Sequence, residues 1–286
     1  MPLITLKEAL SYAVVGQYAI GAFNIESHVS TEAILAAAEE RNVPVIINIA
    51  EAHYDILDMK HFMPYIHDRV KGSPVPVVIN LDHGFSYEGM VQAINYGFSS
   101  IMFDGSKYPF EENVRRTKEI VKIAHAAGVS VEAEIGNVGG LEGESLGKAN
   151  AVDRSAFTVP EEAKRFVEET DIDALAVAVG TIHGIYKGDP DLDYDLLDEI
   201  GDIVRVPLVL HGGSGLSDDD FRNAIKHGIR KINFYTGIVQ GAHDELNRYL
   251  EKANGNVIFA DLTFDVKTRM IKDAGRQMDI FGTKPH

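Results

Sequence analysis

Residues 206–237 read VPLVLHGGSGLSDDDFRNAIKHGIRKINFYTG, and they carry the clearest signal of the fold. The stretch begins with an apolar run, passes through a glycine-rich turn into a segment of helical period, and ends in a second apolar run. Ser217 can cap the N-terminus of the helix, and the three aspartates after it interact favourably with the positive end of the helix dipole. Gly228 can adopt the left-handed backbone conformation that ends a helix. The pattern predicts a strand, a helix over 217–227, and another strand.

The same alternation extends over the whole chain. Runs of this kind, rich in Val, Ile and Ala, fit strands buried on both faces of a parallel sheet. They lie at 18–23, 43–49, 75–81, 99–103, 129–135, 173–179, 206–210 and 230–234. Eight strand–helix units predict an α/β fold, the (β/α)8 TIM barrel. Because no Ser-, Pro- or Gly-rich linker divides the chain, we expect one domain over 1–286.

A doubly wound open sheet is the competing architecture. The barrel is favoured because nearly every apolar run ends in a polar, titratable or glycine-rich signal. In a barrel all strand ends converge on one mouth, where the active sites of this fold lie. Between the strands we expect a helix over 109–127, stopped by Gly128, and a capping box of Thr158 and Glu161 before another helix.

Composition narrows the function. Lys and Arg total 27 and Asp and Glu total 43, so the formal net charge is −16. This acidic balance argues against a nucleic-acid partner, which needs clustered basic residues. The absence of cysteine excludes disulfides and thiolate sites. The start MPLITLKEAL does not form a secretory signal, and no stretch approaches the roughly 20 apolar residues of a membrane helix. We therefore expect a cytoplasmic protein with no membrane partner.

Three of the eleven histidines stand out. His83, His183 and His211 follow apolar runs, and each precedes glycine, in LDHG, TIHG and LHGG. Three imidazoles at a barrel mouth form the ligand set of a catalytic zinc ion with an open fourth position. His28 and His53 also lie near strand ends and stay undecided. We interpret the others as surface or core residues: His61, His67, His125, His227, His243 and His286.

The candidate carboxylates have structural as well as functional interpretations. Asp82, beside a proposed ligand, is either a proton donor and acceptor at the metal or a buried structural residue. Asp104 and Glu134 could be structural residues that cap a helix or pack in the core. They could equally form hydrogen bonds to the metal-binding imidazoles, or hold a second cation. Glu142 lies in the glycine-rich loop GNVGGLEGE, which could act as a lid that carries a base.

Two glycine-rich segments predict an anion site. HGGSG (211–215) follows the seventh predicted strand and NFYTG (233–237) follows the eighth. The loops after these strands often hold phosphate in barrels, because glycine lets backbone N–H groups approach an anion. Ser214 and Thr236 add hydroxyl donors, and Lys187 could add a positive charge.

These segments carry a family resemblance. LDHG, IMFDGS with PFEENV, VEAEIGNVGG, AVAVGTIHGIYK, VPLVLHGGSGL and KINFYT resemble motifs of the class II (zinc-dependent) ketose-bisphosphate aldolases. That family includes fructose-1,6-bisphosphate and tagatose-1,6-bisphosphate aldolases. The resemblance extends from AFN at 22–24 to FGT at 281–283.

The resemblance implies a lyase that cleaves a ketose 1,6-bisphosphate to dihydroxyacetone phosphate and glyceraldehyde 3-phosphate. The three histidines would hold Zn²⁺, Asp82 would move the proton on the aldehyde oxygen, and Glu142 would remove the C1 proton in condensation. Asp104 and Glu134 match outer or alternative metal positions, and Na⁺ or K⁺ also fits. We expect a homodimer or homotetramer. The expected substrate contacts are Asn24, Gly184, Lys187, Gly212, Gly213, Ser214, Asn233 and Thr236.

The sequence departs from the family pattern at three places. Asn80 replaces a common histidine, and Phe234-Tyr235 replaces a small or acidic pair. At the end of the second strand, Asn48-Ile49-Ala50, followed by Glu51, stands where the family usually has a Gln-x-Ser signal. The last change concerns the far end of the substrate. A bisphosphate is the leading expectation, and a ketose 1-phosphate with an unphosphorylated aldehyde half is the alternative.

Three rival functions remain open. An aldolase that forms a Schiff base needs a desolvated lysine pointing into the barrel. We expect none among Lys107, Lys187 and Lys231, the lysines near the strand ends. A zinc hydrolase is disfavoured by the phosphate-type loops. A non-catalytic sugar-phosphate-binding barrel should have lost Asp82 or Glu142, and both are present.

Overall fold

The computed structural model describes residues 2–54, 56–139, 148–149, 153–186 and 190–285. Each of the eight apolar runs contains or overlaps a barrel strand. The strands are β1 (Ile20–Asn24), β2 (Val45–Ala50), β3 (Val77–Gly84), β4 (Ser100–Phe103), β5 (Ser130–Ile135), β7 (Ala174–Val177), β9 (Leu208–Leu210) and β10 (Ile229–Asn233). They pair in parallel and close in the order β1-β10-β9-β7-β5-β4-β3-β2, which confirms the predicted barrel.

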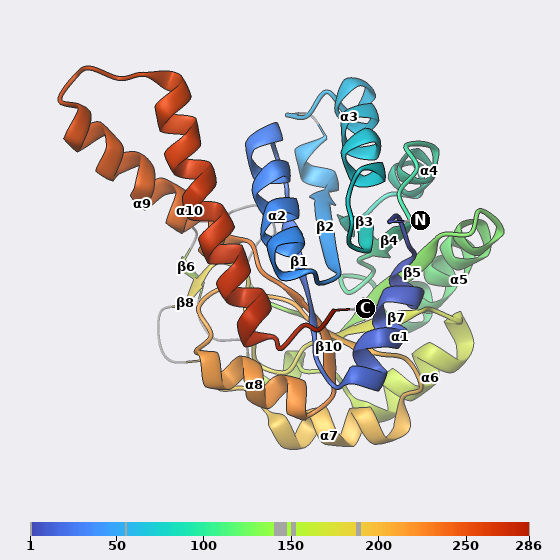
Figure 1. Ribbon diagram of the computed structural model, residues 1–286. Coiled ribbons are helices and arrows are strands. Elements are labelled where there is room, and N and C mark those ends of the chain that lie inside the picture. The colour runs from blue at the N-terminus through green and yellow to red at the C-terminus, as the bar shows by residue number, and fades with distance from the viewer. Residues whose placement is uncertain (1, 55, 140–147, 150–152, 187–189, 286) are drawn as a thin grey trace.

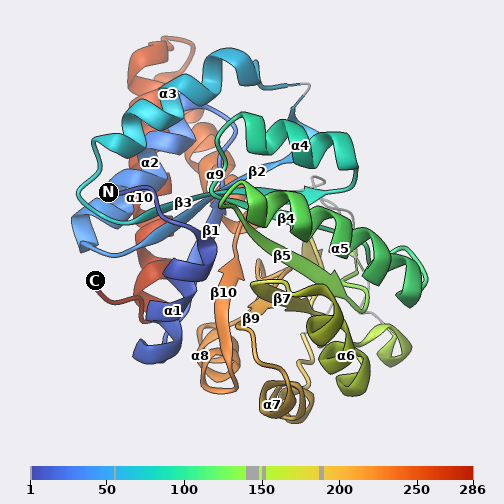
Figure 2. The same cartoon turned by 90° about the vertical axis from the view of Figure 1, so that its right-hand side faces the viewer.

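Helices surround this barrel (Figures 1 and 2). They are α1 (Leu6–Gly16), α2 (His28–Arg41), α3 (Met59–Lys71), α4 (Tyr87–Asn95), α5 (Phe110–Ala126), α6 (Pro160–Thr170), α7 (Tyr194–Ile203), α8 (Asp218–Lys226), α9 (Thr236–Ala253) and α10 (Phe259–Ile280), with 3₁₀ turns η1 (Glu51–His53) and η2 (Arg154–Ala156). A small sheet of β6 (Lys148–Ala149) and β8 (Ile185–Tyr186) was not expected.

The predicted helix ends are confirmed at α8 and wrong at α6. Ser217 caps α8 in a capping box with Asp220. At α6 the residue before the helix is Val159, and Pro160 is its first residue. The Thr158 hydroxyl donates to the Ile135 carbonyl at 2.8 Å and accepts from Ala178 N at 2.9 Å. Thr158 therefore ties the end of β5 to the end of β7 instead of capping a helix.

Helix α1 closes the N-terminal end of the barrel. Leu6, Ala9 and Leu10 are fully buried and pack in one cluster with side chains of the barrel interior. The backbone N–H of Lys7 donates to the Ser130 hydroxyl at the start of β5, at 3.1 Å. Because this end is plugged, the carboxyl ends of the strands form the mouth.

The barrel interior changes from apolar to polar toward the mouth. Alternate residues of a barrel strand face inward. On β3 these are Val78, Asn80 and Asp82, all buried, and only Val78 belongs to the apolar interior cluster. Asn80 stands opposite Asn48 of β2 and donates to its side-chain oxygen at 3.0 Å. These inward-facing polar side chains place hydrogen-bonding groups inside the barrel, next to the carboxyl ends of the strands.

The last two helices form a hairpin that projects beyond the barrel (Figure 1, orange to red). Part of α10 packs against α2 and against α9, and its end returns to the barrel. There the Ala19 N–H donates to the Phe281 carbonyl at 3.2 Å. Within the described ranges, no helix is both long and apolar enough to cross a membrane.

Candidate active site

The three histidines predicted as metal ligands come together at the mouth. His83 lies near the end of β3, His211 follows β9 directly, and His183 lies in the loop after β7. Their ring nitrogens lie within 4.8 Å of one another, and His83 Nε2 faces His211 Nδ1 at 2.8 Å. His83 and His211 are buried, and His183 is half-buried. This set of three convergent imidazoles fits a zinc ion, for which imidazole is a preferred ligand.

Loop contacts carry His183 toward His211, although it lies farther from its strand than the other two ligands. The Tyr186 hydroxyl accepts from Ile182 N and donates to the Gly212 carbonyl, both at 3.0 Å. Gly212 has φ +67°, and a Cβ there would meet the Ile182 carbonyl oxygen at 2.4 Å. Only glycine allows this approach. The sequence offered no signal for this contact, since a single tyrosine forms no pattern.

Both buried histidines bond a carboxylate through the ring nitrogen that faces away from the shared site. His83 Nδ1 lies 3.1 Å from Asp104 Oδ2, and His211 Nε2 lies 2.8 Å from Glu132 Oε1. Such carboxylate partners orient metal-binding imidazoles. Asp104 was a predicted candidate for this position. Glu132 was missed, because a single glutamate within the run VSVEAEI does not differ from its neighbour Glu134 by sequence alone.

Glu134 joins a second group of ligand atoms instead. Its carboxylate lies within 4.8 Å of ligand atoms of His83 and Asp104, and the three could hold a cation. Burial, together with the charge of Asp104, raises the pKa of Glu134 to about 8. Burial alone would also raise the pKa of Asp104, but hydrogen bonds from His83 and Ser106 lower it well below its usual range. Without a cation, these shifts favour the protonated form of Glu134 at neutral pH and the ionised form of Asp104.

Lys231 lies inside the barrel, contrary to the expectation from sequence. It is fully buried on β10, and its Nζ lies 2.7 Å from Glu132 Oε2. Burial would raise the pKa of Glu132, but the charge of Lys231 and the contact with His211 lower it to about 2. Burial lowers the pKa of His211, which favours the neutral imidazole that metals bind.

Asp82 is clamped between two asparagines. Asn24 Nδ2 donates to Asp82 Oδ2 at 3.0 Å, and Asn233 Nδ2 donates to Asp82 Oδ1 at 2.9 Å. The Asp82 side chain is fully buried beside His83. Asn24 and Asn233 were predicted as substrate contacts; the structure places their amides on this carboxylate. The arrangement holds an oriented carboxylate beside His83.

The two glycine-rich loops lie side by side. Ser214 Oγ accepts from the Gly237 N–H at 3.2 Å, which joins the loop after β9 to the start of α9. Thr236 is the first residue of α9, so the N-terminus of this helix, an end that suits anions, opens here. Gly212 and Gly213 belong to the first of these loops, and both are buried, as is Gly184 after His183. Glu142 and Lys187, also predicted for the site, lie outside the described residues.

Glu51 is held by the segment that follows β3. Its Oε2 accepts from the Phe85 N–H at 2.6 Å, and its Oε1 accepts from the Ser86 hydroxyl at 2.7 Å. The carboxylate therefore supports the start of α4. His53, which stayed undecided, is buried with its ring 6.0 Å from that of Tyr235.

Comparison with known proteins agrees with this geometry. The family described as fructose-bisphosphate aldolase class-II matches residues 4–286. Fructose-bisphosphate aldolases from Geobacillus stearothermophilus and Staphylococcus aureus (strain Mu50) are 45% and 44% identical, each over 82% of both chains. The crystal structure of the YdjI aldolase from Escherichia coli K12 covers 99% of this chain and 98% of its own, with a TM-score of 0.87 and 33% identity. The chain belongs to the class-II fructose-bisphosphate aldolase family and is an aldolase, a carbon–carbon lyase.

Proposed function

We propose that this aldolase reversibly cleaves a ketose 1,6-bisphosphate of the fructose or tagatose type to dihydroxyacetone phosphate and glyceraldehyde 3-phosphate. The observation that carries the proposal is the convergence of His83, His183 and His211 beside the clamped carboxylate of Asp82. The relatives named fructose-bisphosphate aldolase support the substrate class.

The three histidines would hold the metal, which we propose to be zinc. Bound there, it would act as a Lewis acid on the ketone and hydroxyl oxygens of the substrate. The outer partners Asp104 and Glu132 hold two of the rings in place. The group of His83, Asp104 and Glu134 offers an alternative cation position. A bound Na⁺ or K⁺ stays a prediction.

Proton transfer falls to Asp82 and Glu142. In cleavage Asp82 would accept the proton of the C4 hydroxyl as the C3–C4 bond breaks and the aldehyde forms. Its two asparagine partners keep both oxygens oriented for this step. Glu142 would donate the proton to the enediolate carbon and would remove it again in condensation.

The phosphate group at C1 of the ketose would bind at the glycine-rich loops. Ser214 and the N-terminus of α9 offer hydroxyl and backbone donors where the loops after β9 and β10 meet. Anions bind well at such helix starts. Gly184, Gly212, Gly213 and Thr236 complete the proposed site, with Lys187 as a positive charge.

The test combines metal removal with a substrate panel. Metal-free protein should lose release of dihydroxyacetone phosphate from fructose and tagatose 1,6-bisphosphates, and added Zn²⁺ should restore it. Borohydride with substrate should leave activity unchanged. If the metal-free protein stays active and borohydride inactivates it, Lys231 would become a Schiff-base candidate and the metal-dependent mechanism would be rejected.

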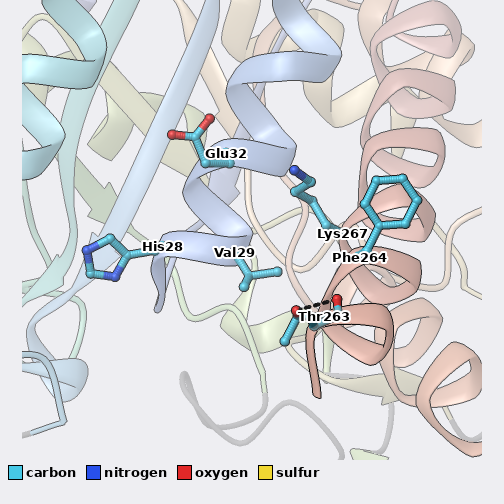
Figure 3. Close-up of a pocket in the computed structure, with 7 residues that line it drawn as sticks. His28, Val29, Glu32, Thr263, Phe264 and Lys267 are labelled. Atoms are coloured by element: carbon cyan, nitrogen blue, oxygen red, sulfur yellow. Dashed lines mark hydrogen bonds between the residues drawn. The ribbon is translucent and has the colours of Figure 1, made fainter. Parts of the chain in front are cut away.

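We also propose that the chain assembles as a homodimer or homotetramer through the α9–α10 hairpin. Its tip and α10 expose Ile258, Phe259 and Phe264, with 77% of Phe259 accessible. Phe264 lines a pocket of about 340 Å³ between α2 and α10 together with His28 (Figure 3). We propose that the hairpin of a second copy covers these apolar groups.

Light scattering tests the assembly. Phe259→Ser combined with Phe264→Ser should shift the protein to monomers. Val15→Ser, at an exposed apolar position on α1, is the matched control and should leave the mass unchanged. A monomeric wild-type protein would reject this assembly.

Two further proposals concern the chain as a whole. We propose that 1–286 forms one catalytic domain, since barrel strands extend from Ile20 to Asn233 and α10 packs back on α2. We propose a cytoplasmic location because the substrates are charged sugar phosphates that membranes retain inside cells.

A further inference from the structure

A buried ion pair lies inside the barrel, next to the metal ligand His211. Lys231 Nζ and Glu132 Oε2 are 2.7 Å apart, and both side chains are fully buried. Their strands, β10 and β5, are separated by β9 and β7 in the barrel order, so the pair crosses the interior. The interior side chains of β7 include Ala174 and Ala176, whose small size leaves room for this crossing.

The two oxygens of Glu132 have different partners. Oε2 faces Lys231, whereas Oε1 lies 2.8 Å from His211 Nε2. An ionised carboxylate can only accept hydrogen bonds, so His211 Nε2 must carry the proton. The other ring nitrogen, Nδ1, then keeps its lone pair, and it faces His83 Nε2 at 2.8 Å within the proposed metal site. Glu132 therefore selects the tautomer of His211 that can bind a metal.

Lys231 makes this selection possible. A buried carboxylate without a counter-charge is strongly unfavourable. The ammonium group supplies that charge and occupies Oε2, which leaves Oε1 for His211. We propose that Lys231 is a positioning residue for the metal ligand His211 and acts through Glu132. This inference rests on the proposed metal-dependent function.

The alternative is an ion pair that only stabilises the barrel. The two roles differ in what they predict for Glu132→Gln. A glutamine has one acceptor, but Lys231 and His211 both present donors. If its oxygen turns to Lys231, its NH₂ group faces His211 Nε2 and forces the proton onto Nδ1, where it blocks metal binding. Removing the competing donor by Lys231→Met should free the glutamine oxygen for His211.

The experiment compares zinc affinity, by chelator competition, for the wild type, Glu132→Gln, Lys231→Met and the double variant. Changes beside metal ligands typically cost about 10–100-fold in metal affinity. We expect a loss of that order for Glu132→Gln and a recovery of about tenfold in the double variant. Met102→Leu is the control, because Met102 is buried beside Glu132 in the barrel register and should bind zinc normally.

A purely structural role predicts the opposite order, because the double variant has lost more of the barrel interior. A double variant that binds zinc no better than Glu132→Gln overturns the inference. The visible spectrum of the Co²⁺-loaded proteins gives a second readout, since loss of one imidazole changes the ligand field.

A measurement on the wild type keeps the inference testable if the variants do not fold. In ¹⁵N-histidine spectra of metal-free protein, with His211 assigned by His211→Asn, we expect the Nε2–H tautomer. An Nδ1–H tautomer rejects the inference. Failure of the proposed function gives a different result: the wild-type protein would not bind zinc, and it would keep its cleavage activity in the presence of a chelator.

Discussion

Asn233 and Asp82 are 151 positions apart in the chain, yet the Asn233 amide donates to Asp82 Oδ1 at 2.9 Å. They meet because β10 and β3 end at the same mouth of the closed barrel, on either side of β1 and β2. Asn24, at the end of β1, donates to the other oxygen from between them. The Asp82 carboxylate is thereby fixed by the barrel itself rather than by a flexible loop.

Asp82→Ala should retain zinc and lose most C–C cleavage. A general acid–base group typically contributes about 10²–10⁴-fold to the rate, and we expect a fall in kcat of that order. Asn24→Ala should give a smaller fall, because Asn233 still holds one oxygen. Zinc content and kcat are measured together; near-normal turnover in Asp82→Ala would assign this residue a structural role.

His211→Ala should abolish both zinc binding and cleavage while the barrel still folds. Removal of one of three imidazoles leaves too few ligands for a tight site. His61→Ala is the matched control, because His61 is an exposed histidine of α3 that contacts Asp58. Metal analysis, circular dichroism and kcat/KM decide the outcome, and full activity without bound metal would contradict the prediction.

Glu142→Ala should slow exchange of the C1 proton of dihydroxyacetone phosphate with solvent. Glu142 lies outside the described residues, so its role stays a prediction from the family resemblance. Exchange of the tritiated or deuterated substrate is measured without an aldehyde, which separates this step from C–C bond formation. Glu144→Ala, two positions further along the same glycine-rich segment, is the matched control and should exchange at the wild-type rate. Unchanged exchange in Glu142→Ala removes it from the mechanism.

The far end of the substrate is tested by comparing kcat/KM for fructose 1,6-bisphosphate, tagatose 1,6-bisphosphate and fructose 1-phosphate. Hydrogen bonds from Phe85 and Ser86 hold the Glu51 carboxylate against the start of α4, so we expect it not to face a second phosphate. A preference for a bisphosphate of more than about a hundredfold, roughly 2.7 kcal/mol, is the expected result. A preference for fructose 1-phosphate would favour the alternative substrate class.

Acid stability should depend on Glu39, far from the active site. Burial would raise its pKa, but hydrogen bonds from Arg69 and Ser73 outweigh this and lower the pKa below its ordinary value. A lowered pKa stabilises the fold above the unfolded pKa and loses that contribution as pH falls through the folded value. Glu39→Gln should therefore flatten the fall of Tm below about pH 4.3, the ordinary pKa of a glutamate. Glu40→Gln, the exposed neighbour, controls for loss of charge; an unchanged slope in Glu39→Gln would contradict the assignment.

The barrel and part of its site followed from local sequence pattern. The eight apolar runs predicted the strands because a strand covered on both faces must be apolar along its length. His83, His183 and His211 each follow an apolar run and precede glycine, and the fold brings the ends of those strands to one mouth. The capping box at Thr158 and Glu161 failed, because Thr158 is used by tertiary contacts between strands.

Local sequence pattern predicted the strand–helix alternation and the three histidines that follow apolar runs, and the shared geometry of barrel strands brings those strand ends to one mouth. The polar groups that act on those imidazoles depend instead on how distant segments meet. Glu132 and Lys231 come from strands that are not neighbours, and Tyr186 bridges two loops. A charged residue in a short strand ordinarily predicts an exposed side chain. Closure of the barrel reverses this, because it brings Lys231 and Glu132 face to face in a space that excludes water.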